Sequence, residues 1–357
     1  MSVIAGVGTA LGAHSYAQEQ ITQAFVTYVL GEDPDPRTAS LLRRFHANSG
    51  VRTRSLALPL EAYPELDGFT GANAAWRDVA VELGAQCVTS ALQQTGLLAS
   101  EVDLVVSTTV TGVVVPSLEA RLMSIVGFRP DVRRVPLFGL GCVAGASGLA
   151  RVHDYLVGHP DDVAVLLAVE LCSLTVQRDD TSTANLVASG LFGDGAAAVV
   201  VVGERRARSL GLAGPQIIAS RSRFYEDTED VMGWDVGASG FRVVLAPTVS
   251  DVVAANLGTD AKGFLADHGL EISDVTRYVS HPGGPKVIDA VTTALALAPE
   301  ALDLTRNSLR DIGNLSSASV LHVLRDTMDS YATGTGDPAL LVAMGPGFCA
   351  ELVLLRW

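Results

Sequence analysis

Two glycine-rich turns, one near the middle of the chain and one near its end, are each followed directly by an apolar segment. The first turn, Leu191–Gly195, leads into a predicted strand at Ala196–Val202. The second turn, Met344–Gly347, leads into a predicted strand at Phe348–Leu355. This repetition indicates an internal duplication in which each half of the chain ends with a glycine turn and an apolar strand.

Composition agrees with a duplicated α/β protein. Hydrophobic residues make up 48% of the 357 residues, and 35 glycines suit a fold with many tight turns. A chain of this length exceeds one typical domain and can bury a large core. We place the boundary in the polar, glycine-containing stretch 203–214, which divides the chain into an N-terminal half, 1–205, and a C-terminal half, 206–357.

Cys142 lies in a glycine- and alanine-rich turn between two predicted elements. Arg133–Phe138 is predicted as a short buried strand, and Gly145–Val157 as an amphipathic or buried helix. The positive end of that helix, with an imidazolium partner, can lower a thiol pKa from about 8.5 to roughly 3.5–7.5. The alternative interpretation is a structural cysteine, because free cysteines are among the most buried residues.

His281 follows a predicted strand, Thr276–Ser280, and begins the segment His281–Pro285, in which two prolines enclose two glycines. Proline fixes φ and glycine permits unusual dihedral angles, so a side chain on this turn can be held in one direction. The other six histidines have no such frame and are predicted as surface or packing residues.

Asn314 lies between a predicted helix that ends near Ile312 and an apolar helix at Ala318–Met328, for which Ser316 or Ser317 is the expected cap. Taken alone, it is a turn or helix-cap asparagine. Together with Cys142 and His281, it completes a thiol nucleophile accompanied by an imidazole and an amide that can stabilise an oxyanion or enolate. That combination forms carbon–carbon bonds from thioesters.

These residues resemble the type III polyketide synthases, the chalcone and stilbene synthase-like members of the thiolase fold, and most of all the actinobacterial alkylpyrone synthases. The resemblance covers essentially the whole chain and implies an αβαβα layered α/β fold with two duplicated mixed-sheet halves. It rests on five signatures in family order: Val115-Pro116-Ser117, Gly141-Cys142, Leu191–Ala196, His281–Pro285 with Gly313–Ala318, and Met344–Gly347.

The resemblance assigns the catalytic roles to Cys142, His281 and Asn314. A starter acyl-CoA loads on Cys142, malonyl-CoA loses carbon dioxide beside His281 and Asn314, and the enolate attacks the loaded thioester. Gate and chamber positions follow from the same alignment: Phe192, Phe241, Thr111, Val115, Cys172, Thr175 and Pro346. Because the chamber residues are small or medium in size, we expect a medium- or long-chain starter and an alkyl α-pyrone, or a resorcinol, as product.

A basic cluster is expected to bind coenzyme A in this acidic chain. Arg43 and Arg44 lie on a predicted helix, Thr38–Asn48, with Arg52 and Arg54 beside it, and Arg44 falls on a phosphate-binding position of the family. Lys286, with Gly283 and Gly284, extends the cluster from the His281 turn. The alternative interpretation is a solvated helix face, since surface arginines are common.

Other classes of partner are disfavoured. A net charge of −14 argues against nucleic-acid binding, and four cysteines without paired spacing imply no metal site. Apolar stretches are interrupted well before about 18 residues, so we expect a cytoplasmic protein without a membrane span. The resemblance implies a homodimer whose substrates are CoA thioesters, with no separate cofactor.

Two alternatives stay open. One is a β-ketoacyl synthase of fatty-acid initiation that uses a carrier protein, although such enzymes usually continue from their histidine with Gln-Ala-Asn rather than Pro-Gly-Gly-Pro. The other is a non-catalytic acyl-CoA-binding protein, which has no reason to keep Cys142, His281 and Asn314 together. A thiolase would need a second catalytic cysteine, and Cys349 is better explained as a packed strand residue.

Overall fold

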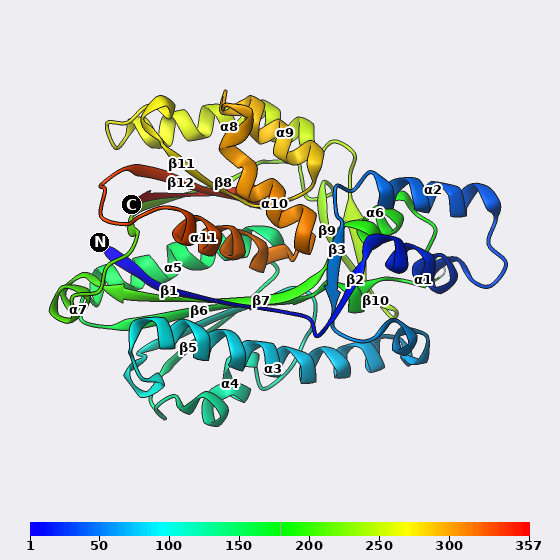
Figure 1. The fold of residues 1–357 in the computed structure, drawn as a ribbon, viewed down its shortest axis with the longest axis horizontal. Helices are drawn as coiled ribbons and strands as arrows, with labels where there is room; N and C mark the ends of the chain where they lie inside the picture. Colours follow the sequence, from blue (N-terminus) through cyan, green and yellow to red (C-terminus); the bar gives the residue numbers. More distant parts are fainter. Residues whose placement is uncertain (179) are drawn as a thin grey trace.

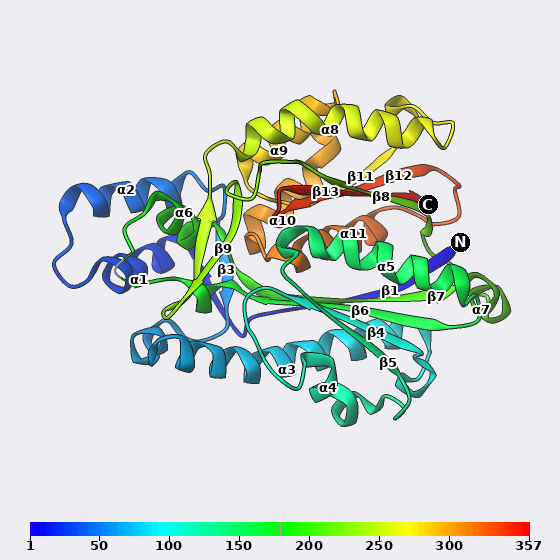
Figure 2. The ribbon, with the colours of Figure 1, turned by 180° about the vertical axis from the view of Figure 1, so that it is seen from behind.

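Two half-sheets enclose a pair of central helices and are themselves covered by outer helices (Figure 1). The structure is a computed structural model that describes residues 1–178 and 180–357. From one face to the other the layers run helix, sheet, helix, sheet, helix, which is the αβαβα order expected. Figure 2 shows the same layers from behind, with both chain termini at one end.

The two half-sheets join into one nine-stranded sheet of order β11-β12-β13-β8-β1-β7-β6-β4-β5. The junction between β1 and β8 has only two residue pairs, Ser2↔Ile217 and Val3↔Gln216, so the halves can fold back on each other. The strands are β1 (Ser2–Leu11), β4 (Leu104–Thr109), β5 (Arg133–Phe138), β6 (Val163–Leu171), β7 (Asp194–Gly203), β8 (Gln216–Phe224), β11 (Arg277–Ser280), β12 (Pro338–Gly345) and β13 (Cys349–Arg356).

Helices lie on both faces of each half-sheet. The central pair is α5 (Ala144–Gly158) and α11 (Ser319–Ser330); the outer helices are α3 (Gly68–Thr95) and α4 (Leu118–Leu122) below, and α8 (Val249–Ala266), α9 (Pro285–Ala294) and α10 (Asp303–Ile312) above. Helices cover both faces of β6 and β7. The two strands are therefore buried throughout, and their sequences are nearly continuous runs of apolar residues. Gly148 lets α5 approach β6, since a Cβ there would lie 2.5 Å from Leu166 Cδ1.

A smaller group of elements stands beside the layers and borders the site. It contains α1 (Gln18–Leu30), α2 (Pro36–Ala47), α6 (Thr183–Leu191), the ribbon β2 (His14–Ala17) with β3 (Thr53–Leu56), and the hairpin β9 (Met232–Gly237) with β10 (Gly240–Leu245). The hairpin pairs only with itself, from Gly240↔Gly237 to Leu245↔Met232. None of the described helices is long and apolar enough to cross a membrane.

Two local predictions from sequence are wrong. Arg133–Phe138 is a strand, but β5 is the outermost strand of the sheet and most of its residues are exposed rather than buried. Neither Ser316 nor Ser317 caps α11 with its side chain; both face buried groups instead. The stretch 203–214, in which the boundary between the halves is predicted, contains the short helix α7 (Glu204–Leu210).

Candidate active site

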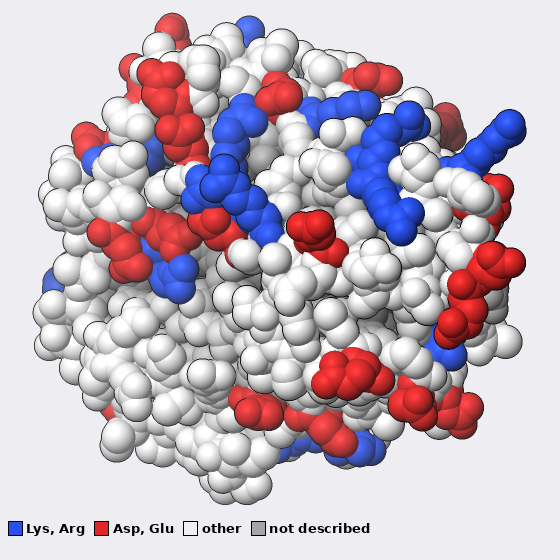
Figure 3. Space-filling view, turned by 45° about the vertical axis from the view of Figure 1, so that its right-hand side comes forward, with Lys and Arg blue, Asp and Glu red and all other residues white. Residues whose placement is uncertain are grey.

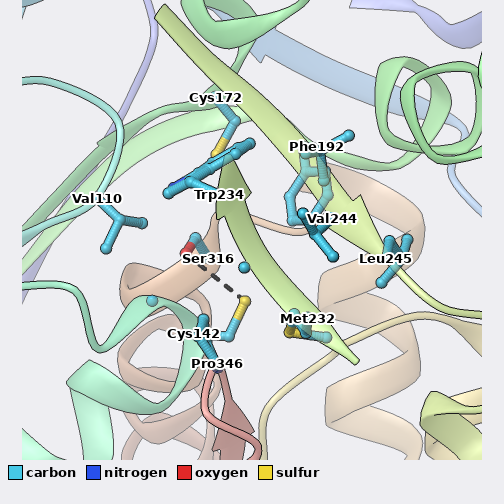
Figure 4. A pocket seen from close by; sticks show the side chains of 13 residues that line it. Val110, Cys142, Cys172, Phe192, Met232, Trp234, Val244, Leu245, Ser316 and Pro346 are labelled. Carbon is cyan, nitrogen blue, oxygen red and sulfur yellow. Dashed lines mark hydrogen bonds between the residues drawn. The ribbon is translucent and has the colours of Figure 1, made fainter. Parts of the chain in front are cut away.

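Cys142 sits in a single helical turn, Gly141–Val143, that leads directly into α5. Only 6% of the residue is exposed. Gly141 has φ +56°, and a Cβ there would lie 2.6 Å from Pro346 Cδ, so glycine is required both by the backbone and by the close approach. The Sγ atom faces Ser316 Oγ at 3.6 Å (Figure 4).

Burial, rather than the dipole of α5, has the largest effect on the pKa of the Cys142 thiol. Removal from water raises the pKa of Cys142 to about 12, the Ser316 hydroxyl lowers it, and the negative charge of Glu170 raises it. The expected lowering of the pKa of Cys142 is therefore not found. Its proton must pass to a neighbouring base before the sulfur can attack.

His281 follows the last residue of β11, and its backbone N–H continues the sheet by donating to Val342 O at 2.9 Å. The ring is buried, and neither Nδ1 nor Nε2 bonds to any described protein group. Burial lowers the pKa of His281 to about 3, so the ring is neutral. A neutral imidazole with free nitrogens can accept a proton or donate to an oxyanion.

Asn314 is held by its backbone and by its amide oxygen. Its N–H donates to Leu191 O and its carbonyl accepts from Gly193 N, both at 3.0 Å, which ties it to the segment around Phe192. Its Oδ1 accepts from Ser316 N at 2.8 Å. The Nδ2 group is therefore directed to the His281 turn, where Gly283 O lies 3.5 Å away.

A narrow cavity of about 40 Å³ lies over Cys142. In Figure 4, Trp234 and Cys172 lie across the cavity from Cys142, with Phe192 and Leu245 on one side. The hairpin β9–β10 supplies much of this wall. The residues that line the cavity are Val110, Gly141, Cys142, Cys172, Phe192, Met232, Gly233, Trp234, Val243, Val244, Leu245, Ser316 and Pro346.

A second, larger cavity of about 360 Å³ lies beyond Phe241. The Phe241 ring packs against Trp234 of the first cavity, with centroids 5.9 Å apart, and against Phe69 of the second cavity, at 5.4 Å. Phe241 therefore stands in the partition between the two cavities. Thr111 and Thr175 line the second cavity.

Two buried carboxylates lie on the adjacent strands beneath this site. Glu170, on β6, accepts from Ser317 Oγ at 2.5 Å, Thr111 Oγ1 at 2.9 Å and Val110 N at 3.1 Å. Burial raises the pKa of Glu170 to about 7. Glu170 can therefore exist in either protonation state near neutral pH.

Asp194, on β7, accepts from Ala57 N at 2.6 Å and Ser173 N at 2.8 Å, and burial raises its pKa to about 6. The positive charge of the buried Arg54 guanidinium partly opposes that rise. Arg54 in turn donates to Gln18 Oε1 at 2.9 Å and to Phe192 O at 2.6 Å. This cluster therefore supports the backbone of Phe192.

Comparison with known proteins gives a match for each half of the chain. The chain matches the N-terminal domain of chalcone and stilbene synthases over residues 1–205 and the C-terminal domain over residues 216–357. It is 54% identical to a 1,3,6,8-tetrahydroxynaphthalene synthase of Streptomyces peucetius subsp. caesius, with 99% of this chain and 93% of that protein covered. It is 33% identical to a 3,5-dihydroxyphenylacetyl-CoA synthase of Amycolatopsis balhimycina, with 99% and 92% covered.

The fold agrees with these relatives. The crystal structure of 1,3,6,8-tetrahydroxynaphthalene synthase from Streptomyces coelicolor A3(2), a bacterial type III polyketide synthase, superposes with a TM-score of 0.92. The two share 32% identity, and 99% of each chain is covered. This chain belongs to the chalcone and stilbene synthase family. It is a type III polyketide synthase with the thiolase-like fold expected from its sequence.

The structure of this polyketide synthase brings most of the expected site residues together. Cys142 connects through Ser316 to Asn314, and Asn314 reaches the His281 turn through Gly283. Cys172, Phe192 and Pro346 line the first cavity. Val115 lines neither cavity, because it lies on the surface with 91% of its area exposed.

The basic cluster of the polyketide synthase is only partly as expected. Arg43 and Arg44 are exposed on α2, and Lys286 is exposed on α9. Arg52 N donates to Arg310 O at 2.7 Å, and Gly50 lies against Pro285, so α2, α9 and α10 meet on one side of the molecule. Figure 3 shows Lys and Arg side chains gathered on the upper part of that side.

Arg54 does not belong to this surface. Only 2% of it is exposed, and its guanidinium is directed inward to Gln18 and Phe192. Four further groups were missed from sequence: Met232, Trp234, Ser316 and Glu170. The single Gly233 between Met232 and Trp234 does not mark them as site residues, and the sequence predicts Ser316 only as a helix cap.

Proposed function

We propose that this type III polyketide synthase makes 1,3,6,8-tetrahydroxynaphthalene from malonyl-CoA alone. The observation that carries the proposal is the crowding over Cys142, where about 40 Å³ of free space suits a short acyl group. The names of the Streptomyces relatives support the product. The ten carbons of a naphthalene correspond to five two-carbon units, so malonyl-CoA can supply both starter and extender.

Loading begins with proton transfer from Cys142 to His281. The ring nitrogens of His281, which bond to no described protein group, can take the thiol proton, and the resulting imidazolium stabilises the thiolate. Burial, which lowers the pKa of His281, opposes this transfer, and the negative charge of the thiolate favours it. The sulfur attacks the thioester carbonyl of the starter, the carbon–sulfur bond to CoA breaks, and CoA leaves with a proton. An acyl group then remains on Cys142.

Extension of the chain uses Asn314 and His281. Asn314 Nδ2 and a ring N–H of His281 donate to the thioester oxygen of malonyl-CoA, which stabilises the enolate formed as carbon dioxide leaves. The enolate carbon attacks the acyl group on Cys142, and the thiolate leaves. The chain, longer by two carbons, is then carried by CoA and can be loaded again.

Coenzyme A thioesters enter as substrates, without a separate cofactor. Arg43, Arg44 and Lys286 are exposed on the side where α2 and α9 meet, and within the described residues none of them forms an ion pair with a carboxylate. They can therefore attract the phosphates of coenzyme A. Gly283 and Gly284 precede the first turn of α9 and permit close approach of a ligand to the backbone.

A homodimer would complete the site. Strand β5 is an open sheet edge on which Val135 and Phe138 are 42% and 54% exposed, and Val115 lies on the loop after β4 with 91% exposed. We propose that β5 packs against a second copy and that Val115 enters the partner's chamber. Phe138→Glu should then yield monomers in size-exclusion chromatography with light scattering, and an unchanged dimer would contradict this arrangement.

A medium- or long-chain starter with an alkyl α-pyrone or resorcinol product is the second candidate. The cavity of about 360 Å³ beyond Phe241 favours it, because Thr111 and Thr175 line that space. The partition formed by Phe241 and Trp234 separates it from Cys142. We therefore rank it below the malonyl-primed product.

Mass spectrometry of products distinguishes the two. Purified enzyme is given malonyl-CoA alone, then malonyl-CoA with starters from acetyl- to stearoyl-CoA, with Cys142→Ala as the blank. Tetrahydroxynaphthalene, or its air-oxidised naphthoquinone, from malonyl-CoA alone is the expected result. Alkyl pyrones that form only when a long acyl-CoA is supplied would contradict it, and condensation only with a malonyl-carrier protein would indicate a ketoacyl synthase.

Trp234 offers a sharper version of the same experiment. Trp234→Ala should enlarge the first cavity and open it toward the second, so longer starters should be accepted. Trp234→Phe retains an aromatic side chain and serves as the matched control. Identical starter ranges for the two variants would show that Trp234 does not limit starter length.

A further inference from the structure

Ser316 has an unusual backbone conformation next to the catalytic cysteine. Its φ is +47°, in the left-handed region that residues other than glycine seldom adopt. Of the described non-glycine residues with positive φ, the other two are Asp227 and Ala296, and neither lines the cavity over Cys142. Strain of this kind persists only where surrounding contacts impose it, and it gathers at functional sites.

The hydroxyl of Ser316 faces the nucleophile. Ser316 Oγ lies 3.6 Å from Cys142 Sγ, a distance compatible with a hydrogen bond to sulfur. The residue lines the cavity and is only 4% exposed. The adjacent Ser317 is turned away and donates to Glu170, so the arrangement is particular to one of the two serines.

The backbone of Ser316 faces the catalytic amide. Its N–H donates to Asn314 Oδ1 at 2.8 Å, which leaves Nδ2 as the group directed to the His281 turn. An amide rotated by half a turn would present a carbonyl oxygen to the enolate and repel it. The left-handed turn therefore places one residue in contact with both Cys142 and Asn314.

We infer that Ser316 is a positioning residue that serves the two half-reactions separately: its hydroxyl holds the Cys142 sulfur for loading, and its backbone N–H orients the Asn314 amide for decarboxylation. The inference rests on the polyketide chemistry proposed above but not on the identity of the product. A hydroxyl can donate to a thiolate and accept from a thiol, so the contact can persist through ionisation.

Two variants separate the roles. Ser316→Ala removes the hydroxyl but keeps the N–H and the strained backbone. Ser316→Gly also removes the hydroxyl but relieves the strain, so it tests whether any defect comes from misfolding. Ser308→Ala is the matched control, because Ser308 is a buried serine whose hydroxyl has no partner among the described residues.

The first readout is the rate of iodoacetamide alkylation of Cys142 as a function of pH. Loss of one hydrogen bond to the sulfur should slow alkylation at neutral pH by roughly 2- to 10-fold in both Ser316 variants and move the profile to higher pH. Glu170 and Cys172 are the titratable groups whose charges act on or with the Cys142 thiol, and both are unchanged in these variants. Ser308→Ala should alkylate like the parent enzyme.

The second readout is the rate of malonyl-CoA decarboxylation in a Cys142→Ala background. This variant cannot load an acyl group, so its decarboxylation depends on His281 and Asn314 alone. Adding Ser316→Ala should leave this rate within about 2-fold, since the N–H to Asn314 remains. Unchanged alkylation in both Ser316 variants would overturn the inference, as would equal losses in alkylation and decarboxylation. Neither readout requires product formation, so a different product in the mass-spectrometric experiment leaves this test intact.

Discussion

Glu170 and Asp194 are two buried carboxylates on neighbouring strands, and they differ in one respect. Both are fully buried, both accept several hydrogen bonds, and burial raises the pKa of each. The positive charge of the buried Arg54 opposes the rise for Asp194, whereas the groups that bond to Glu170 are hydroxyls and a backbone N–H. The comparison assigns the carboxyl near a buried cation to the supporting scaffold, while the carboxyl with the higher pKa lies near the nucleophile.

Loss of the Asp194 charge should have the largest effect. Asp194→Asn replaces one carboxylate oxygen by an NH2 group that cannot accept from Ala57 N or Ser173 N, and a buried donor left without an acceptor costs about 1–3 kcal/mol of unfolding free energy. Urea denaturation at neutral pH measures it. Asp161→Asn, which removes an exposed partner of Arg205, is the control and should cost at most about 1 kcal/mol.

A double variant tests whether part of the cost arises from the buried charge of Arg54. Arg54→Met in the Asp194→Asn background removes the guanidinium, so part of the lost stability should return. If Asp194→Asn alone costs no more than the exposed control, the surroundings of Asp194 do not stabilise the fold through this carboxylate.

Glu170→Gln should change the pH dependence of stability. The pKa of Glu170 is raised from 4.5 to about 7 in the folded protein, so between these values the folded state binds more protons than the unfolded state. Unfolding free energy of the parent protein should therefore fall, relative to Glu170→Gln, by about 1–3 kcal/mol as pH rises from 4.5 to 7. Below pH 4.5 the two curves should run parallel; parallel curves throughout would contradict the raised pKa.

Arg54→Lys tests the surroundings of Asp194. Lysine keeps a positive charge near Asp194 but cannot donate to both Gln18 and Phe192 in the same geometry. We expect a loss of about 1–2 kcal/mol in urea denaturation, smaller than for Asp194→Asn. A loss equal to that of Asp194→Asn would mean that hydrogen-bond geometry, not charge, stabilises the cluster.

The smallest effect is on the reactivity of Cys142. The negative charge of Glu170 raises the pKa of that thiol, so Glu170→Gln should make alkylation at pH 8 faster by roughly 2- to 5-fold. The rate of iodoacetamide labelling reports it. Slower alkylation would show that Glu170 supports the thiolate rather than opposing it.

Sequence alone locates three residues in the fold, and their catalytic roles stay predictions. The glycine and proline frames place Cys142 at the start of α5, His281 after β11 and Asn314 after α10. The layered fold followed from the resemblance. Glycine turns and apolar runs are local properties, which is why they could be read without the structure.

Predictions from sequence are wrong where the position or pKa of a side chain depends on residues far along the chain. Arg54 looked like a surface cation because its neighbours Arg43, Arg44 and Arg52 are exposed, yet Asp194 and Phe192, far along the chain, draw it inward. The thiol pKa was expected to fall because the helix is local, whereas the burial that raises it is tertiary. Trp234 lines the cavity through the hairpin β9–β10, in which the sequence marked Phe241 but not Trp234.

Covalent loading of Cys142 is the central claim, and peptide mapping tests it most directly. The enzyme is incubated with carbon-13-labelled malonyl-CoA, quenched in acid, digested with pepsin and examined by mass spectrometry. We predict labelled acyl thioesters on the peptide that contains Cys142 and none on the same peptide of Cys142→Ala. Label on Cys172, or product formation without any label on Cys142, would contradict the account.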